Sequence, residues 1–502
     1  MRLYNSRTRA LEEFAPLDGR RVRIYMCGLT PSADSHLGHA RSMLFFDVLR
    51  RYLELSGYEV TYVQNVTDID DKIIARAAAE GIPWQQVVEK YNGSFVAGLD
   101  RLGVRRPDAE PRATEHIPKI VELIAGLERL GIAYESEDGV YYAVRKWPSY
   151  GKLSGRNVDE LRESVRIDGS EYKRDPLDFA LWKKQKPGEP AWESPWGPGR
   201  PGWHIECSAM SWEYLGEPFD IHGGGLDLIF PHHENEIAQT EPLIHGAPMA
   251  NFWVHTGLLF FDGSKMSKTL GNFVPLEEEL RRYDPRALRA LFLQIDYRKQ
   301  ANFTASSIDA ATKGLQRLDE ALAELTRRAG LERLDEEAAE ALRAPARDDA
   351  AMVRAFREAL DDDMNTAGAL AALFAWLGSA RTREGEAARS AARALYAAMS
   401  VLGIAPRLEE LHARVAGGSD GGAVIALDAE RLDRLTRLYR EVVGERPNGN
   451  AAPEMVEAIL AVRTRAREAR DWARSDELRD ALAGAGIALK DGREGTTWTV
   501  AG

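Results

Sequence analysis

Two segments of the chain carry side chains that could bind a nucleoside triphosphate. In the first, His36 and His39 flank Gly38 where a strand-like apolar run leads into a helical pattern. Imidazoles and the N–H groups of a helix N-terminus bind phosphate oxygens, and glycine lets a nucleotide approach the backbone. In the second, Lys265 and Lys268 stand three residues apart among small residues, so their ammonium groups could neutralise a triphosphate. Alone, each motif could equally be a turn with surface histidines or a solvated basic loop.

Further polar segments accompany these motifs in a fixed order. Cys27 directly precedes the first motif, and the others are Asn65 to Lys72, Gly202 to Met210 with Cys207, Asp220 to Asp227, and Pro231 to Glu236. Together they resemble the cysteinyl-tRNA synthetases, a family of class I aminoacyl-tRNA synthetases whose HIGH and KMSKS signatures match the two nucleotide-binding motifs. The likeness runs to Trp498. No Walker A loop or nucleophilic-serine elbow competes with it.

The resemblance implies a zinc ion held by Cys27, Cys207, His232 and Glu236. Two thiolates, an imidazole and a carboxylate are a reasonable zinc set, and residues four apart on a helix share one face. His233 and Glu234 are expected to point elsewhere. As isolated thiols the cysteines would be read as inert core residues. Serine differs from cysteine by one atom, worth only ~1–3 kcal/mol to a pocket that relies on shape, whereas zinc can bind the substrate thiolate directly.

The activity implied by the resemblance is activation of L-cysteine with ATP, accompanied by Mg²⁺, and transfer from cysteinyl-adenylate to tRNA(Cys). His36, His39, Lys265 and Lys268 are the expected catalytic residues. The expected ATP contacts are His36, Gly38, His39, Gly223, Gly224, Gly225, Asp227 and Lys268, and the expected cysteine contacts are Gly28, Thr30, Thr67 and Trp203. Any of the three glycines could instead belong to an ordinary turn, and a tryptophan is more often a core residue.

The elements that must position these residues form an α/β pattern. Strand-like runs at Val22 to Met26 and Glu59 to Val63 enclose a helical run, Ala40 to Leu55, which predicts a parallel sheet. From Pro111 to Pro198 the pattern is irregular, and the sheet is expected to resume near Trp203. The predicted fold is a Rossmann-like catalytic domain with an inserted connective domain, then an α-helical bundle and a small C-terminal module. The expected boundaries are 1–110 and 199–262 for the catalytic domain, 111–198 for the insertion, 263–306 for the KMSKS and stem-contact region, 307–420 for the bundle and 421–502 for the anticodon-binding module.

The composition fits a multidomain globular protein. The chain has 502 residues, 44% of them hydrophobic and 29% charged, and a net charge of −12, so RNA must be bound by local basic patches. No apolar run could cross a bilayer and no secretory signal is evident, so a cytoplasmic location is expected. The protein is also expected to be a monomer, although nothing in the sequence gives the oligomeric state. Near the C-terminus Arg463, Arg465, Arg467, Arg470 and Arg474 form a basic stripe, and Trp498 could stack on a base. Such a stripe is usually a solvated helix face.

Two departures and two rival functions accompany the resemblance. Thr30 is followed by Pro31, Ser32 and Ala33 where the family commonly has an aromatic residue and an aspartate, and Thr269 stands where serine is usual. The first rival is a related ligase that joins cysteine to an amino-sugar inositol in thiol biosynthesis and lacks the C-terminal module. The second is a zinc-structured RNA-binding protein without catalysis, against which both intact signatures speak. The segments Asp284 to Arg289 and Asp362 to Thr366 resemble family motifs without an evident catalytic use.

Overall fold

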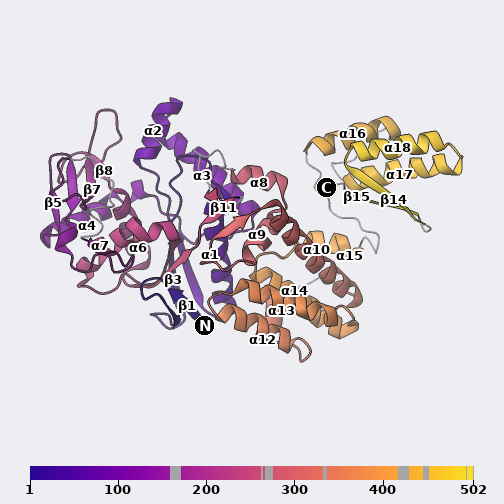
Figure 1. Cartoon of the computed structure of the whole chain (residues 1–502), viewed down its shortest axis with the longest axis horizontal. Helices are drawn as coiled ribbons and strands as arrows, with labels where there is room; N and C mark the ends of the chain where they lie inside the picture. Colours follow the sequence, from indigo (N-terminus) through magenta and orange to yellow (C-terminus); the bar gives the residue numbers. More distant parts are fainter. Residues whose placement is uncertain are drawn as a thin grey trace. The chain divides into compact units, whose positions relative to one another are not determined.

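The computed structural model describes residues 1–158, 171–261, 264–265, 275–331, 336–416, 429–444, 452–492 and 495–500. It divides into two compact units (Figure 1). One comprises Met1–Leu318, Glu337–Gly378 and Arg393–Ala405, and the other Asp319–Glu336, Ser379–Ala392 and Pro406–Gly502. Within the described ranges, none of the helices combines the length and the apolar character that crossing a membrane requires.

A four-stranded parallel sheet forms the centre of the first unit. Its strand order is β10 (Ala250–Thr256), β9 (Phe219–Gly225), β3 (Arg21–Met26) and β4 (Glu59–Gln64). The apolar side chains of β3 are fully buried, as a strand covered on both faces requires. Helix α1 (Leu37–Leu55) connects β3 to β4 and buries Leu44, Phe45, Val48, Leu49 and Tyr52. The predicted parallel α/β fold is therefore confirmed.

A long connection separates β4 from β9. It contains α2 (Asp71–Glu80), α3 (Trp84–Arg101), α4 (Ile117–Arg129) and an antiparallel sheet ordered β5 (Ala133–Glu135), β6 (Gly139–Tyr142), β7 (Phe179–Lys184) and β8 (Gly199–Pro201). This sheet has its own core around Trp182 and Trp196. Its strands are short and irregularly spaced, so the sequence from Pro111 to Pro198 shows only an irregular pattern. The expectation that the parallel sheet resumes near Trp203 is wrong, because α6 (Trp203–Leu215) occupies that position and the sheet resumes at β9.

The remaining elements up to residue 416 belong to the first unit, except residues 319–336, 379–392 and 406–416, which the second unit contains. Strand β11 (Leu259–Phe261) pairs with β13 (Ala301–Phe303) in parallel and with β12 (Ser264–Lys265) in antiparallel orientation. An N-terminal hairpin, β1 (Arg2–Asn5) and β2 (Ala10–Glu13), completes the strands of the first unit. The remaining helices to residue 416 are α7 (Glu234–Thr240), α8 (Leu276–Arg282), α9 (Pro285–Leu293), α10 (Ala305–Arg328), α11 (Glu340–Arg343), α12 (Ala350–Asp361), α13 (Thr366–Ala380), α14 (Gly385–Val401) and α15 (Leu408–Ala416).

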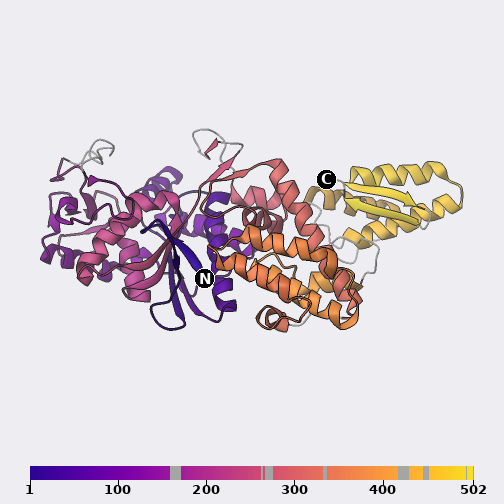
Figure 2. The ribbon, with the colours of Figure 1, turned by 60° about the horizontal axis from the view of Figure 1, so that its bottom comes forward.

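The C-terminal part of the second unit consists of helices α16 (Ala429–Val443), α17 (Ala452–Glu468) and α18 (Trp472–Gly484), and of the hairpin β14 (Ile487–Gly492) and β15 (Gly495–Val500). Figure 2 shows the helices side by side with the hairpin along them. Arg463 is 3% exposed and donates to the Ser475 carbonyl and the Thr496 hydroxyl. The prediction that Arg463 belongs to an exposed basic stripe is therefore wrong, since it holds the hairpin to the helices.

Candidate active site and metal centre

Several predicted site residues follow the carboxyl ends of the parallel strands, whereas Trp203 and Cys207 lie in α6, directly before β9. Because these ends meet at one edge of the sheet, segments distant in sequence come together there. The Cys27 amide donates to the Gly223 carbonyl at 3.2 Å, and the Gly28 amide donates to Asn65 Oδ1 at 2.8 Å. A Cβ on Gly28 would lie 1.6 Å from the Asn65 carbonyl oxygen, so only glycine permits this approach. The Thr67 amide donates to the Leu29 carbonyl, which brings Gly28 and Thr67 into one network.

The four predicted zinc ligands lie together at this edge. Their candidate ligand atoms are all within 4.8 Å of one another, and each side chain is at most 5% exposed. Cys27 Sγ lies 3.8 Å from Cys207 Sγ and 3.7 Å from Glu236 Oε1, and His232 Nε2 lies 3.1 Å from Glu236 Oε1. In tetrahedral zinc, Zn–S bonds of ~2.3 Å place two sulfur ligands ~3.8 Å apart. The donor types and their spacing both fit zinc.

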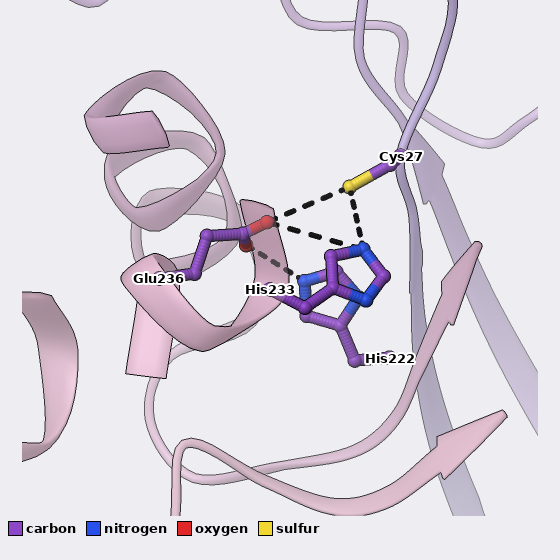
Figure 3. Close-up of side chains that lie close together, drawn as sticks. All are labelled: Cys27, His222, His233 and Glu236. Carbon is purple, nitrogen blue, oxygen red and sulfur yellow. Dashed lines mark hydrogen bonds and ion pairs between the residues drawn. The ribbon is translucent and has the colours of Figure 1, made fainter. Parts of the chain in front are cut away.

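A second candidate set shares two of these residues. Cys27, His222, His233 and Glu236 also cluster, with His233 Nε2 3.3 Å from Cys27 Sγ and His222 Nε2 2.8 Å from Glu236 Oε2 (Figure 3). The expectation that His233 points away from the ligands is wrong, because His233 has helical backbone angles and stands three residues before Glu236, so both side chains lie on one face of the helix. The 2.8 Å between His222 and Glu236 is a hydrogen-bond distance, shorter than the 3.1 Å between His232 and Glu236, and only the first set contains a sulfur pair at the tetrahedral separation of ~3.8 Å. This favours the Cys207 and His232 set, with His222 as a hydrogen-bond donor that orients Glu236.

Glu234 behaves as expected of a residue outside the cluster. Its carboxylate accepts hydrogen bonds from the backbone amides of Gly151, Leu153 and Ser154. The connective insertion is thereby tied to the helix that carries Glu236.

Burial controls the protonation of the cluster. It raises the pKa of the Cys27 thiol well above its ordinary value, and the neighbouring Cys207 and Glu236 raise it further. Burial also lowers the pKa of His232 and of His233 well below the usual range for histidine. The imidazoles are therefore neutral and ready to bind a metal, while the Cys27 thiol keeps its proton in the metal-free protein.

Trp203 and His204 at the start of α6 pack against His232. The Trp203 ring stacks on the His232 ring with centroids 4.2 Å apart, and His204 Nδ1 lies 2.9 Å from His232 Nδ1. The second contact leaves His232 Nε2 directed at Glu236 and fixes the ring orientation. The structure thus brings Trp203, a predicted cysteine contact, beside the cluster, while Thr30 is half-buried on the segment after Gly28.

The first signature motif begins α1. His36 is the N-cap residue, its Nδ1 accepts from the Gly38 amide at 3.0 Å, and His39 Nδ1 accepts from the His36 amide at 3.3 Å. The two imidazoles are half-buried and stack with centroids 3.8 Å apart. The histidines therefore stand at a helix N-terminus, where phosphate oxygens bind favourably.

The second signature motif is described only in part. The backbone of Lys265 lies in β12 opposite Phe260 of β11. Lys268 and Thr269 lie outside the described residues. The catalytic assignment of the two lysines therefore stays a prediction.

The glycines of β9 serve packing. A Cβ on Gly223 would lie 2.2 Å from the Phe46 ring, and one on Gly224 would lie 2.7 Å from the His233 ring. Both positions therefore admit no side chain for reasons internal to the protein. Gly225 is half-buried and Asp227 is exposed, so this end of the segment has the solvent access that an ATP contact needs.

One exposed aromatic residue escaped the sequence reasoning. Trp472 is 58% exposed at the start of α18, between Arg470 and Arg474. An exposed tryptophan among arginines is typical of a nucleic-acid surface. The adjoining arginines were the available signal, but a tryptophan in a helical pattern is ordinarily assigned to the core.

Comparisons with known proteins agree with this geometry. The family model for the class I (C) tRNA synthetase catalytic domain matches residues 13–313, a DALR domain matches 355–405, and the cysteinyl-tRNA ligase anticodon binding domain matches 450–498. The cysteine–tRNA ligase of Trichlorobacter lovleyi is 44% identical over 100% of this chain and 99% of its own length. That of Desulfovibrio desulfuricans is 46% identical over 99% of each.

Solved structures share the fold. The methionyl-tRNA synthetase of Mycobacterium tuberculosis with methionyl-adenylate has a TM-score of 0.54 at 16% identity, covering 87% of this chain and 96% of its own. The LeuRS of Agrobacterium radiobacter K84 in a ternary complex has a TM-score of 0.58 at 11% identity, covering 82% and 87%. With the parallel sheet, the signature helix and three matched domains in order, the chain belongs to the cysteinyl-tRNA ligase family, whose members are ATP-dependent class I aminoacyl-tRNA synthetases.

Proposed function

We propose that this protein is a cysteine–tRNA ligase that activates L-cysteine with ATP and transfers it to tRNA(Cys). The observation that carries the proposal is the cluster of Cys27, Cys207, His232 and Glu236 at the same sheet edge as the N-terminus of α1. A thiol-selective metal site beside a phosphate-binding helix end suits a reaction in which cysteine meets ATP.

Zinc is the metal that this donor set fits, and when bound it would supply a soft Lewis acid that selects a thiolate over the hydroxyl of serine. Cys27, Cys207, His232 and Glu236 hold it. His222 orients the Glu236 carboxylate, and Trp203 and His204 orient the His232 ring. Gly28, Thr30, Thr67 and Trp203 frame the remainder of the cysteine. Glycine at position 28 keeps the two strand ends close enough for this pocket to form.

For the ATP side, the reaction needs charge neutralisation and alignment more than covalent chemistry. The substrate carboxylate attacks the α-phosphate, which gives cysteinyl-adenylate and pyrophosphate. His36, His39 and the N-terminus of α1 bind phosphate oxygens, and Lys265 and Lys268 stabilise the charge that develops on them. Gly38, Gly223, Gly224, Gly225 and Asp227 border the adenosine, and Mg²⁺ accompanies ATP.

For the tRNA side, the C-terminal module supports a nucleic-acid acceptor. Residues 450–498 match an anticodon binding domain, and Trp472 with its neighbouring arginines provides a surface on which an unpaired base can stack. The terminal ribose hydroxyl of the tRNA attacks the activated carbonyl, the anhydride bond to phosphate breaks, and AMP leaves. This module favours tRNA over the amino-sugar inositol acceptor of the rival ligase. We also propose that the protein acts as a monomer in the cytoplasm.

The proposal is tested by cysteine-dependent ATP–pyrophosphate exchange and by charging of a tRNA(Cys) transcript. The wild-type protein is compared with Lys268→Ala, which removes a phosphate contact, and with Cys207→Ser, which removes a proposed zinc ligand. Zinc is quantified in each preparation. We expect exchange and charging in the wild type, with both strongly reduced in the two variants and zinc lost only from Cys207→Ser.

The other outcomes identify the rivals. Exchange without charging points to the small-molecule ligase, and the amino-sugar inositol then replaces tRNA in the assay. Zinc and tRNA binding without exchange points to an RNA-binding protein that does not catalyse.

A further inference from the structure

A buried arginine follows the first signature motif by two residues. Arg41 lies in α1, is 3% exposed and directs its guanidinium toward two separate segments of backbone. Nη1 donates to the carbonyls of Gly257 at 2.5 Å and Leu258 at 3.0 Å. Nη2 donates to the carbonyls of Asp296 at 3.3 Å, Tyr297 at 3.3 Å and Lys299 at 2.7 Å. One side chain thus gathers five carbonyl groups.

The two backbone segments that Arg41 contacts lie directly before β11 and directly before its partner strand β13. Gly257 and Leu258 connect β10 of the parallel sheet to β11, and residues 296–299 lead into β13, the parallel partner of β11. The Gly257 amide donates to the Tyr297 carbonyl at 2.7 Å, and the Ala301 amide donates to the Leu258 carbonyl at 3.0 Å. A Cβ on Gly257 would lie 2.1 Å from the Lys299 carbonyl oxygen. The two backbones therefore cross as closely as glycine allows.

The same crossing is held to α1 by a second contact. Ser42 Oγ lies 2.5 Å from Thr256 Oγ1, the last residue of β10. Burial lowers the pKa of Arg41 to about 10, so the side chain remains a cation at neutral pH and its hydrogen bonds to carbonyls are charge-assisted. A buried cation is expensive unless it is fully hydrogen-bonded, and the five carbonyls meet that requirement.

We propose that Arg41 is a positioning residue for adenylate formation. It fixes β11 and β12 relative to the histidines at the start of α1, and β12 contains Lys265 of the second signature motif, called the lysine motif below. The inference rests on the proposed function. His36 and His39 begin the helix that carries Arg41, and Lys265 lies in the strand paired with β11. A change in the crossing therefore changes the separation between the two signatures, and adenylation is sensitive to displacements on the order of 1 Å.

A second group, Asp363, also contacts the 296–299 segment, which gives a structural role to a motif without a catalytic use. Asp363 Oδ1 accepts from the Tyr297 hydroxyl and from the Tyr4 amide, each at 2.8 Å, and Asp363 Oδ2 pairs with Arg298 at 2.8 Å. The segment is thus held by both Arg41 and Asp363. Asp363, which lies between α12 and α13, contacts its side chains, whereas Arg41 contacts its backbone carbonyls.

The test compares Arg41→Lys with Arg23→Lys in ATP–pyrophosphate exchange. Lysine keeps the charge at position 41 but donates from a single nitrogen, so it cannot reach five carbonyls. Arg23 is the matched control, because its guanidinium also donates to backbone carbonyls, those of Leu215 and Pro218, but at the opposite end of β3. For Arg41→Lys we expect kcat of exchange to fall on the order of 10- to 100-fold, with KM for cysteine and bound zinc unchanged.

A mutant cycle separates positioning from general stability. If Arg41 acts through the lysine motif, Arg41→Lys costs little further activity in a Lys265→Ala background, because the group being positioned is already missing. Two results would overturn the inference. One is an exchange rate of Arg41→Lys within about twofold of that of the Arg23→Lys control. The other is a double variant whose loss of activity equals the product of the losses in Arg41→Lys and Lys265→Ala. If Arg41→Lys does not fold, Gly257→Ala replaces it, because a Cβ at position 257 would push against the Lys299 carbonyl at the same crossing. Its exchange activity is compared with the same control and in the same mutant cycle. A wild-type protein without cysteine-dependent exchange would instead overturn the proposed function itself.

Discussion

In the metal cluster the polar side chains are buried, whereas in the described part of the C-terminal module many of them face solvent. Cys27, Cys207, His232 and Glu236 are at most 5% exposed and come from three separate segments. Trp472 is 58% exposed, and Arg465 and Arg470 of the same module are also exposed. A buried cluster has one geometry and loses its function when a single group is removed, because the remaining groups stay desolvated. An exposed RNA surface divides its binding energy among contacts that water can replace.

The largest effect is expected for Cys207→Ser. Serine is a poor zinc ligand, and the remaining donors cannot complete the tetrahedron, so zinc affinity and cysteine-dependent exchange should each fall by more than about 100-fold. Zinc is measured by metal analysis after dialysis. Ser208→Ala, which changes the neighbour of Cys207 in α6 and removes only a hydrogen bond with Gln239 of α7, is the control and should retain zinc. Full zinc content in Cys207→Ser would show that the cysteine is not a ligand.

The pH dependence of zinc binding probes the same buried environment. Burial raises the pKa of the Cys27 thiol, so near neutral pH the metal-free protein holds a proton that zinc must displace. Affinity should therefore rise with pH, by up to about tenfold per displaced proton per pH unit, until the pH exceeds the thiol pKa. Zinc titrations at about pH 6.5 and about pH 7.5, with proton release recorded in weakly buffered solution, measure this. An affinity independent of pH in this range would argue against thiol ligands.

A smaller effect is expected at His222 and distinguishes the two candidate ligand sets. If His222 only orients Glu236, His222→Ala should weaken zinc binding by about 10- to 100-fold, and His222→Gln, which keeps an N–H donor, should restore much of it. If instead Cys27, His222, His233 and Glu236 bind the metal, His222→Gln should lose zinc and Cys207→Ser should keep it. Competition with a chelating dye gives the affinities.

The smallest effect on catalysis is expected at the exposed surface. Stacking on a base contributes ~1–3 kcal/mol, so Trp472→Ala should raise KM for tRNA by roughly 5- to 150-fold and leave pyrophosphate exchange unchanged. Tyr214→Ala removes another exposed aromatic side chain and is the matched control. If Trp472→Ala reduced exchange as well, the division between a buried chemical site and a separable RNA surface would be incorrect.

The sequence by itself determined the local elements and the residue types. The runs around β3, α1 and β4 have the apolar spacing of their final structures, and the parallel fold follows from their order. The two signature motifs, together with the segments that contain Cys27, Cys207, His232 and Glu236, were enough to identify the family. Local sequence also predicted that His232 and Glu236 lie near each other, because they stand four residues apart.

Only the tertiary structure decided which neighbours these residues meet. His222 reaches Glu236 from β9, a strand whose position depends on pairing with β3 and β10, and no local pattern predicts that contact. In the sequence Arg463 resembles the exposed arginines near it, but in the structure it is buried and donates a hydrogen bond to Thr496 of the hairpin. Arg41 lies in an ordinary helical pattern, yet its five acceptors belong to segments more than 200 residues away. Contacts of this kind depend on backbone crossings such as that at Gly257, which arise when distant segments pack together and leave no periodic signal in the sequence.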